Sequence, residues 1–84
     1  MKWVVVGLSA YDAWAERFDE VDVRMAVLEW LIGLQDAGPP PDGQFDPNRD
    51  TWSVTVPGTR LTVEYVVAPF LDPPAIAVRH FRQD

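Results

Sequence analysis

The order of hydrophobic patterns along the chain constrains the fold more than any other feature of the sequence. Apolar residues recur at helical spacing in the first half, which ends in Gly-Pro-Pro-Pro at 38–41. Three short strand-like runs follow, at 51–56, 59–67 and 75–82, and another valine-rich run opens the chain at 2–7. The sequence therefore predicts the order β-α-α-β-β-β, an α+β fold with two helices packed on one face of an antiparallel sheet.

Two helices are predicted before the prolines. Ser9 is expected to cap a helix over residues 10–18, with Tyr11, Trp14 and Phe18 on one face. The second helix shows the clearer pattern and ends at Gly38. Its apolar stripe consists of Val23, Val27, Trp30, Leu31 and Leu34. A further apolar set widens the stripe, so this helix is expected to face apolar neighbours on more than one side: Val21, Met25, Leu28 and Ile32.

The strands of the second half alternate between apolar and polar residues. A Pro-Gly turn at 57–58 joins the first two strands, and the segment 38–50 is expected to be a polar loop. On the second strand, one face carries Leu61, Val63, Tyr65 and Val67 and the other carries Arg60, Thr62, Glu64 and Val66. On the last strand, strict alternation places Ile76, Val78, His80 and Arg82 on one face, opposite Ala77, Arg79 and Phe81.

Composition narrows the class of protein. The 84 residues are enough for one small domain, residues 1–84, and the absence of cysteine excludes disulfides and thiolate metal sites. The opening apolar run is too short for a signal peptide, and no run has the length of a membrane span, so a cytoplasmic protein with no membrane partner is expected. The net charge of −6 lies wholly in residues 1–50, and a field of that sign repels nucleic acid.

Two segments of the second half resemble a known family. The stretch GTRLTVEYVV at 58–67 is similar to a strand of the RelE/ParE superfamily of bacterial toxins, and IAVRHFR at 76–82 resembles the closing strand of that family. In that family a strand and a helical hairpin precede a meander sheet, which agrees with the predicted order over nearly the whole chain.

The resemblance implies a bacterial or phage-borne toxin-like component of a toxin–antitoxin system. The implied target is messenger RNA at the ribosome for the RelE type and DNA gyrase for the ParE type. The implied partner is a short antitoxin that lays a helix or strand along the toxin, and no cofactor is expected. The resemblance also implies that Arg60 contacts phosphate and that Arg79, His80 and Arg82 form a basic cluster.

These residue types suit RNA cleavage by attack of a 2′-hydroxyl group. Such a reaction needs proton transfer and cations that stabilise developing charge. The roles implied are proton transfer by His80, charge stabilisation by Arg60 and Arg82, and base catalysis by Glu64. The residues also allow simpler readings, because Arg60 and Glu64 share a strand face and are placed to form an ion pair. Arg79 and His80 are expected on opposite faces, which would keep them from serving one site.

A second hypothesis is a non-catalytic protein–protein interaction module on the same scaffold, alone or as a homodimer. Trp52 begins a strand and is the tryptophan most suited to an interface. Arg79 and Phe81 on the last strand complete the set of residues predicted to bind a partner. The acidic cluster Asp19, Glu20 and Asp22 has the spacing of a solvated helix junction, so no metal site is predicted.

Overall fold

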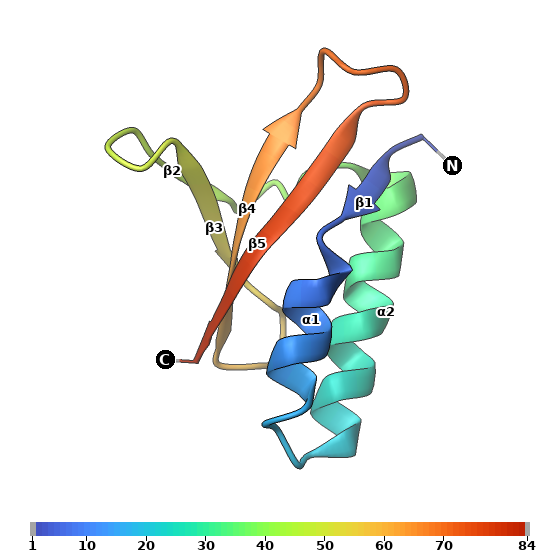
Figure 1. The fold of residues 1–84 in the computed structure, drawn as a ribbon, viewed down its shortest axis with the longest axis vertical. Coiled ribbons are helices and arrows are strands. Elements are labelled where there is room, and N and C mark those ends of the chain that lie inside the picture. The colour runs from blue at the N-terminus through green and yellow to red at the C-terminus, as the bar shows by residue number, and fades with distance from the viewer. Residues whose placement is uncertain (1, 84) are drawn as a thin grey trace.

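The computed structural model of this chain describes residues 2–83. Within that range the chain forms two helices and five strands, which confirms the predicted α+β class. In chain order the elements are β1 (Val4–Val6), α1 (Leu8–Ala15), α2 (Val21–Ala37), β2 (Gln44–Asp46), β3 (Thr51–Thr55), β4 (Leu61–Ala68) and β5 (Ala75–Gln83). Figure 1 shows one twisted sheet with the helices to one side of it.

The sheet is mixed rather than antiparallel, which corrects the prediction. Its strand order is β1-β5-β4-β3-β2, with β1 parallel to β5 and every other pair antiparallel. After β1 the chain passes through both helices and re-enters the sheet at the far edge, as β2. Successive hairpins then return the chain to β1, so the direction of β5 is set by those hairpins and not by a turn from β1.

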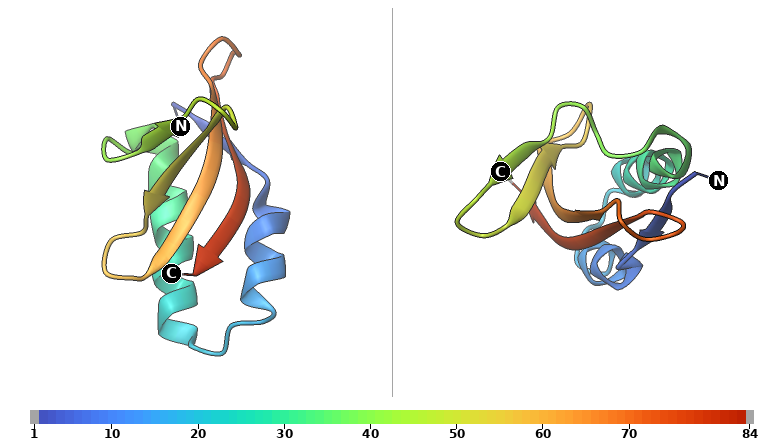
Figure 2. Two further views of the ribbon diagram at one scale, coloured as in Figure 1. Left: turned by 90° about the vertical axis from the view of Figure 1, so that its left-hand side faces the viewer. Right: turned by 90° about the horizontal axis from the view of Figure 1, so that it is seen from above.

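Both helices cover the same face of the sheet. In the left view of Figure 2 the sheet lies in front of both helices. The predicted stripes explain this arrangement, because Trp14 of α1 and Val27, Leu31 and Leu34 of α2 are buried in one apolar cluster with the strands. Each fully buried side chain of this kind contributes about 1.5–3 kcal/mol to stability.

Helix α1 begins earlier than predicted. It spans Leu8–Ala15 rather than 10–18, and Gly7 rather than Ser9 is its N-cap residue. Gly7 has a φ of 82°, and a Cβ at this position would overlap the backbone carbonyl of Val78. Because only glycine combines this backbone conformation with so close an approach, it is required where β1 turns into α1.

Helix α2 carries apolar residues that lie outside the core. Val21, Met25 and Ile32 are 57%, 51% and 54% exposed. The prediction that α2 faces apolar neighbours on more than one side is therefore wrong within residues 2–83. The helix does end at Gly38, as predicted. Within the described range, no helix is both long and apolar enough to cross a membrane.

Part of the predicted polar loop forms a further strand, β2. Its Phe45 lies opposite Trp52 of β3, with ring centroids 5.2 Å apart. In the turn that follows β2, the N–H of Asn48 donates a hydrogen bond to Oδ1 of Asp46 at 3.0 Å. Asp, Asn and Pro favour such turns, but three residues of strand are too few to show a clear alternation in the sequence.

Strand β5 contains one residue more than the facing part of β4. Glu64 lies opposite His80, whereas the next residue of β4, Tyr65, lies opposite Val78. Arg79 is therefore an extra residue, and the strand bulges at this point. A bulge of this kind shifts the alternation of side chains by one position.

The bulge keeps three apolar side chains of β5 in the core. Ile76, Val78 and Phe81 are at most 5% exposed. Phe81 stacks on Trp14 with centroids 5.5 Å apart, and Phe18 extends the stack at 5.0 Å from Trp14. The prediction that Phe81 faces away from Ile76 and Val78 is therefore wrong, because strict alternation does not hold through the bulge.

Tyr65 buries its hydroxyl group in the core. The residue is 2% exposed, and its Oη has no hydrogen-bond partner within residues 2–83. Burial raises the pKa of Tyr65 above its ordinary value of 10.0. Gly43 packs directly against the hydroxyl, so that a Cβ on Gly43 would overlap it.

We expect Gly43→Ala to lower the free energy of unfolding by about 1–3 kcal/mol, because the added methyl group overlaps the Tyr65 hydroxyl. Tyr65→Phe removes a buried hydroxyl without a partner, and we expect it to raise the free energy of unfolding by about 1 kcal/mol. In the Tyr65→Phe background, Gly43→Ala should lower the free energy of unfolding by clearly less than it does in the wild type. Urea unfolding of both single variants and the double variant measures these effects, and an equal cost in both backgrounds would contradict the contact.

Candidate functional site

The sheet face opposite the helices, which we call the open face, carries most of the charged strand residues. On β4 and β5 it presents Thr62, Glu64, Val66, Arg79, His80 and Arg82. The bulge at Arg79 determines this set, because the residues after it change sides relative to those before it. The prediction that His80 and Arg82 share a face with Ile76 and Val78 is therefore wrong.

Arg79 and His80 line the same hollow, although strict alternation predicts opposite faces. Both side chains are exposed. The hollow, which we call the sheet-face hollow, has a volume of about 650 Å³ and is lined by Arg49, Asp50, Thr51, Glu64, Val66, Arg79 and His80. The bulge therefore allows two neighbouring residues to serve one site.

Glu64 is the centre of an ion-pair network on this face. Its carboxylate accepts two hydrogen bonds from the guanidinium of Arg49, at 2.9 and 2.8 Å, and one from Arg82 at 3.2 Å. The Glu64 side chain is 7% exposed, whereas those of Arg49 and Arg82 are 56% and 50% exposed. The two arginines take the place of Arg60, which the sequence suggested as the partner of Glu64.

Arg49 reaches Glu64 from the hairpin between β2 and β3. The backbone N–H of Arg49 donates a hydrogen bond to the backbone carbonyl of Asp46 at 3.3 Å, and the backbone carbonyl of Arg49 accepts one from the Thr51 hydroxyl at 2.8 Å. The next residue, Asp50, has a φ of 52°, a conformation that aspartate adopts more readily than most residues. The sequence reasoning missed Arg49, and the turn-forming residues around it were the available signal.

The network holds Glu64 in its charged form. The hydrogen bond from Arg49 is the main cause that lowers the pKa of Glu64 below its ordinary value of 4.5, while burial opposes this effect. The positive charges of Arg49, Arg82 and His80 act in the same direction as the hydrogen bond. A carboxylate with a lowered pKa is a weaker base, so Glu64 is better suited to orient the arginines than to accept a proton.

Cationic side chains gather at the sheet-face hollow, although the net charge of the chain is −6. Arg49, Arg79, His80 and Arg82, which we call the cationic cluster, surround Glu64, and Asp50 is the other acid that lines the hollow. In the lining, Arg49 and Arg79 balance Asp50 and Glu64 in charge, and Arg82, which bonds to Glu64, adds a further guanidinium group beside the hollow. Guanidinium groups bind phosphate and carboxylate oxygens with paired N–H donors, so the arrangement suits an anionic ligand.

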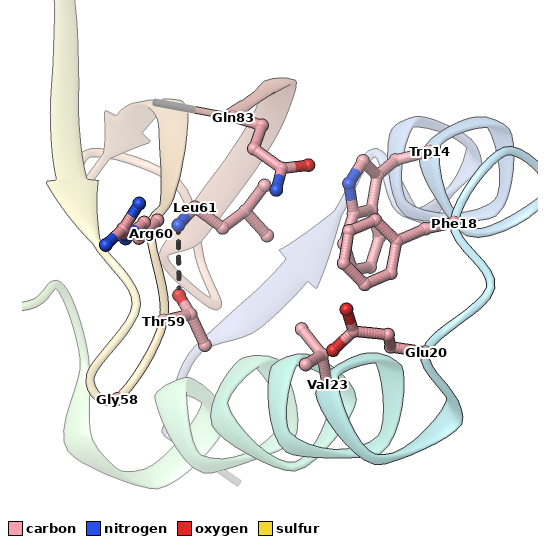
Figure 3. Close-up of a pocket in the computed structure, with 9 residues that line it drawn as sticks. All are labelled: Trp14, Phe18, Glu20, Val23, Gly58, Thr59, Arg60, Leu61 and Gln83. Atoms are coloured by element: carbon pink, nitrogen blue, oxygen red, sulfur yellow. Dashed lines mark hydrogen bonds between the residues drawn. The ribbon is translucent and has the colours of Figure 1, made fainter.

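Arg60 lies apart from this cluster, in a separate hollow beside the 57–58 turn. That hollow has a volume of about 340 Å³ and is lined by Trp14, Phe18, Glu20, Val23, Gly58, Thr59, Arg60, Leu61 and Gln83. Figure 3 shows the guanidinium of Arg60 pointing away from Trp14 and Phe18, whereas Leu61 points toward them. The two hollows share no lining residue. Of the four residues assigned catalytic roles, Glu64 and His80 line the sheet-face hollow and Arg82 bonds to Glu64, whereas Arg60 lines the other hollow.

The residues predicted to bind a partner differ in accessibility. Arg79 is exposed, and Trp52 is half-buried between the rings of Phe45 and Tyr65, at 5.2 and 6.5 Å. Phe81 is 5% exposed and belongs to the core. Phe81 is therefore a packing residue rather than a contact residue, because the bulge turns it toward the helices.

The acidic residues at the helix junction lie outside the open face. Asp19, Glu20 and Asp22 are exposed, and Asp22 lies in the first turn of α2, where a carboxylate complements the helix N-terminus. Within residues 2–83, no three His, Asp or Glu side chains are grouped so that they could hold a metal ion.

Comparison with known proteins yields no match. No protein-family model matches the chain, and no curated protein or solved structure matches it significantly. The resemblance to the RelE/ParE superfamily therefore remains a prediction, which rests on residues 58–67 and 76–82 and on the order of the elements.

We expect Glu64→Gln to weaken the dependence of stability on acid pH. Because the folded-state pKa of Glu64 lies below its ordinary value of 4.5, its contribution is present above that pH and is lost as the pH falls through the folded value. At neutral pH the substitution should cost about 1 kcal/mol, since both arginines remain half exposed.

Thermal unfolding at a series of pH values below neutrality measures this effect. Glu29→Gln, which removes an exposed carboxylate of α2, is the matched control and should keep the wild-type dependence on pH. The same dependence in both variants would contradict the role assigned to the Glu64 network.

Proposed function

We propose that this chain is a toxin-like protein of the RelE/ParE kind that binds the phosphate backbone of single-stranded RNA on its open face. The observation that supports this proposal most directly is the bulge, which sets Arg79 and His80 into one hollow with Arg49. Contacts between basic residues and phosphates supply the sequence-independent part of nucleic-acid affinity. Cations that follow one another along β5, with Arg49 of the β2–β3 hairpin beside them, suit an extended anionic chain.

The distribution of charge makes this binding compatible with a net charge of −6. Seven of the thirteen acids lie between residues 12 and 36, in the helices and the junction between them. At physiological ionic strength, exposed charges separated by more than about 8 Å are largely screened from each other. The cationic cluster therefore acts on a ligand through its local charge, and binding should weaken steeply with added salt.

His80, and not Glu64, is the residue we assign to proton transfer in RNA cleavage. The exposed imidazole of His80 lines the sheet-face hollow, whereas the bonds from Arg49 hold Glu64 in its charged form. Arg79 and Arg82 are suited to stabilise charge on a phosphate. Messenger RNA at the ribosome is then the target, and a short antitoxin is the expected partner.

A non-catalytic protein–protein interaction module is the second candidate function. A different observation favours it: Val21, Met25 and Ile32 form an exposed apolar surface on α2. Contiguous apolar patches larger than about a few hundred Å² are rare on monomeric proteins and mark interaction sites.

We expect Arg79→Ala to weaken binding of a labelled single-stranded RNA by about tenfold and to reduce the salt slope of the logarithm of affinity by about 0.7, as for one lost phosphate contact. Arg17→Ala, which removes an exposed arginine outside the open face, is the matched control and should bind like the wild type. Fluorescence anisotropy over a range of salt concentrations measures both quantities. Equal losses in the two variants would argue against a site on the open face.

Induced expression in a bacterial host tests the toxin assignment. We expect growth arrest with new codon-phased 5′ ends on translated messages, and we expect Arg79→Ala/His80→Ala to abolish both. Arrest without new ends would point to a protein target such as DNA gyrase. Normal growth on expression of the wild type would overturn the toxin assignment and leave the RNA-binding measurement to stand by itself.

A further inference from the structure

The outward side of α2 carries a regular apolar stripe. Its residues Val21, Met25, Leu28 and Ile32, which we call the outer stripe, are separated by four, three and four positions. Residues with this spacing lie along one side of a helix, as the contact residues of a coiled coil do. Leu28 is half-buried and the other three are more than half exposed.

A row of carboxylates runs beside the outer stripe. Asp22, Glu29 and Asp36, which we call the acidic row, are spaced seven residues apart and all are exposed. In a coiled coil, residues at such positions flank the apolar seam and pair with charged residues of the partner helix. A partner helix that fits this side of α2 therefore has an apolar face with basic residues beside it.

We propose that the outer stripe binds an amphipathic helix whose apolar face is flanked by lysine or arginine. Burial of the apolar surface of the stripe supplies the driving force. The acidic row determines that the flanking residues of the partner helix are positively charged, because like charges placed across an interface are strongly unfavourable. This inference rests on the second candidate function, the interaction module, and does not involve the open face.

The same charges disfavour a second copy of this chain as the occupant. Antiparallel pairing of two α2 helices would set one acidic row against the other. Parallel pairing would set the acidic row against Arg24 and Leu31, on the other flank of the stripe. The guanidinium of Arg24 already donates to the carbonyl of Ala15 at 3.4 Å, and Leu31 is 1% exposed. One half-buried guanidinium cannot balance the three carboxylates of the acidic row of a second copy, so parallel pairing also leaves excess negative charge at the interface.

Two matched synthetic helices test the charge preference of the full chain. Each is about three heptads long, to favour helix formation, with leucine at the seam positions. One carries lysine at the flanking positions and the other carries glutamate. Isothermal titration calorimetry measures both dissociation constants, and we expect the lysine peptide to bind at least about tenfold more tightly.

Three double variants separate docking on the stripe from attraction by net charge. Met25→Ser/Ile32→Ser keeps the charge and should weaken binding of the lysine peptide by about tenfold. Glu29→Lys/Asp36→Lys reverses two charges of the acidic row and should abolish the preference for the lysine peptide. Asp12→Lys/Glu16→Lys makes the same change of charge at exposed sites of α1 and its C-cap and should retain that preference.

Unchanged binding by Met25→Ser/Ile32→Ser, or equal effects of the two charge reversals, would overturn the proposal in favour of attraction by net charge. Dimerisation of the free chain in sedimentation, abolished by the same serine variant, would assign the stripe to a second copy and would also overturn it. Arg79→Ala should bind the lysine peptide as the wild type does. Failure of RNA binding on the open face would therefore leave this docking surface standing.

Discussion

The extra residue in β5 determines the composition of both faces of the sheet. Phe81 completes the aromatic stack against Trp14, and burial of such a ring contributes about 1.5–3 kcal/mol. Without the bulge at Arg79, Phe81 would face solvent and His80 would enter the core, where an unpartnered polar group is costly. The apolar requirement of the core therefore fixes the bulge, and the grouping of Arg79 and His80 on the open face follows from it.

Besides the bulge, the carboxylate of Glu64 determines how the charged residues of the open face are arranged. It comes from the middle of β4, it is almost fully covered, and a covered carboxylate without partners would cost several kcal/mol. Arg49 and Arg82 satisfy it from two other segments, the β2–β3 hairpin and the end of β5. The network thus links the hairpin to the sheet, and it holds the guanidinium groups of Arg49 and Arg82 beside Glu64.

The two proposed sites have opposite charges and lie on opposite layers of the fold. The cationic cluster belongs to the open face of the sheet, and the acidic row belongs to the outer side of α2. Under the two proposals, an acidic chain would bind an anion on one side and a basic helix on the other, because solvent ions screen the charges between them. Each site is therefore open to test by variants that leave the other unchanged.

The sequence by itself determined the elements with long, regular patterns. The apolar stripe of α2, the end of that helix at Gly38 and the alternation on β3 and β4 follow from spacing alone, since these segments obey the helical or strand period. Only the tertiary structure decided the bulge in β5, the parallel pairing of β1 and the role of Arg49. Each depends on contacts between residues far apart in the chain: which side chains the helices cover, which edge the chain re-enters, and which cation reaches a covered carboxylate. The spacing of apolar and polar residues within one segment does not predict contacts with distant segments.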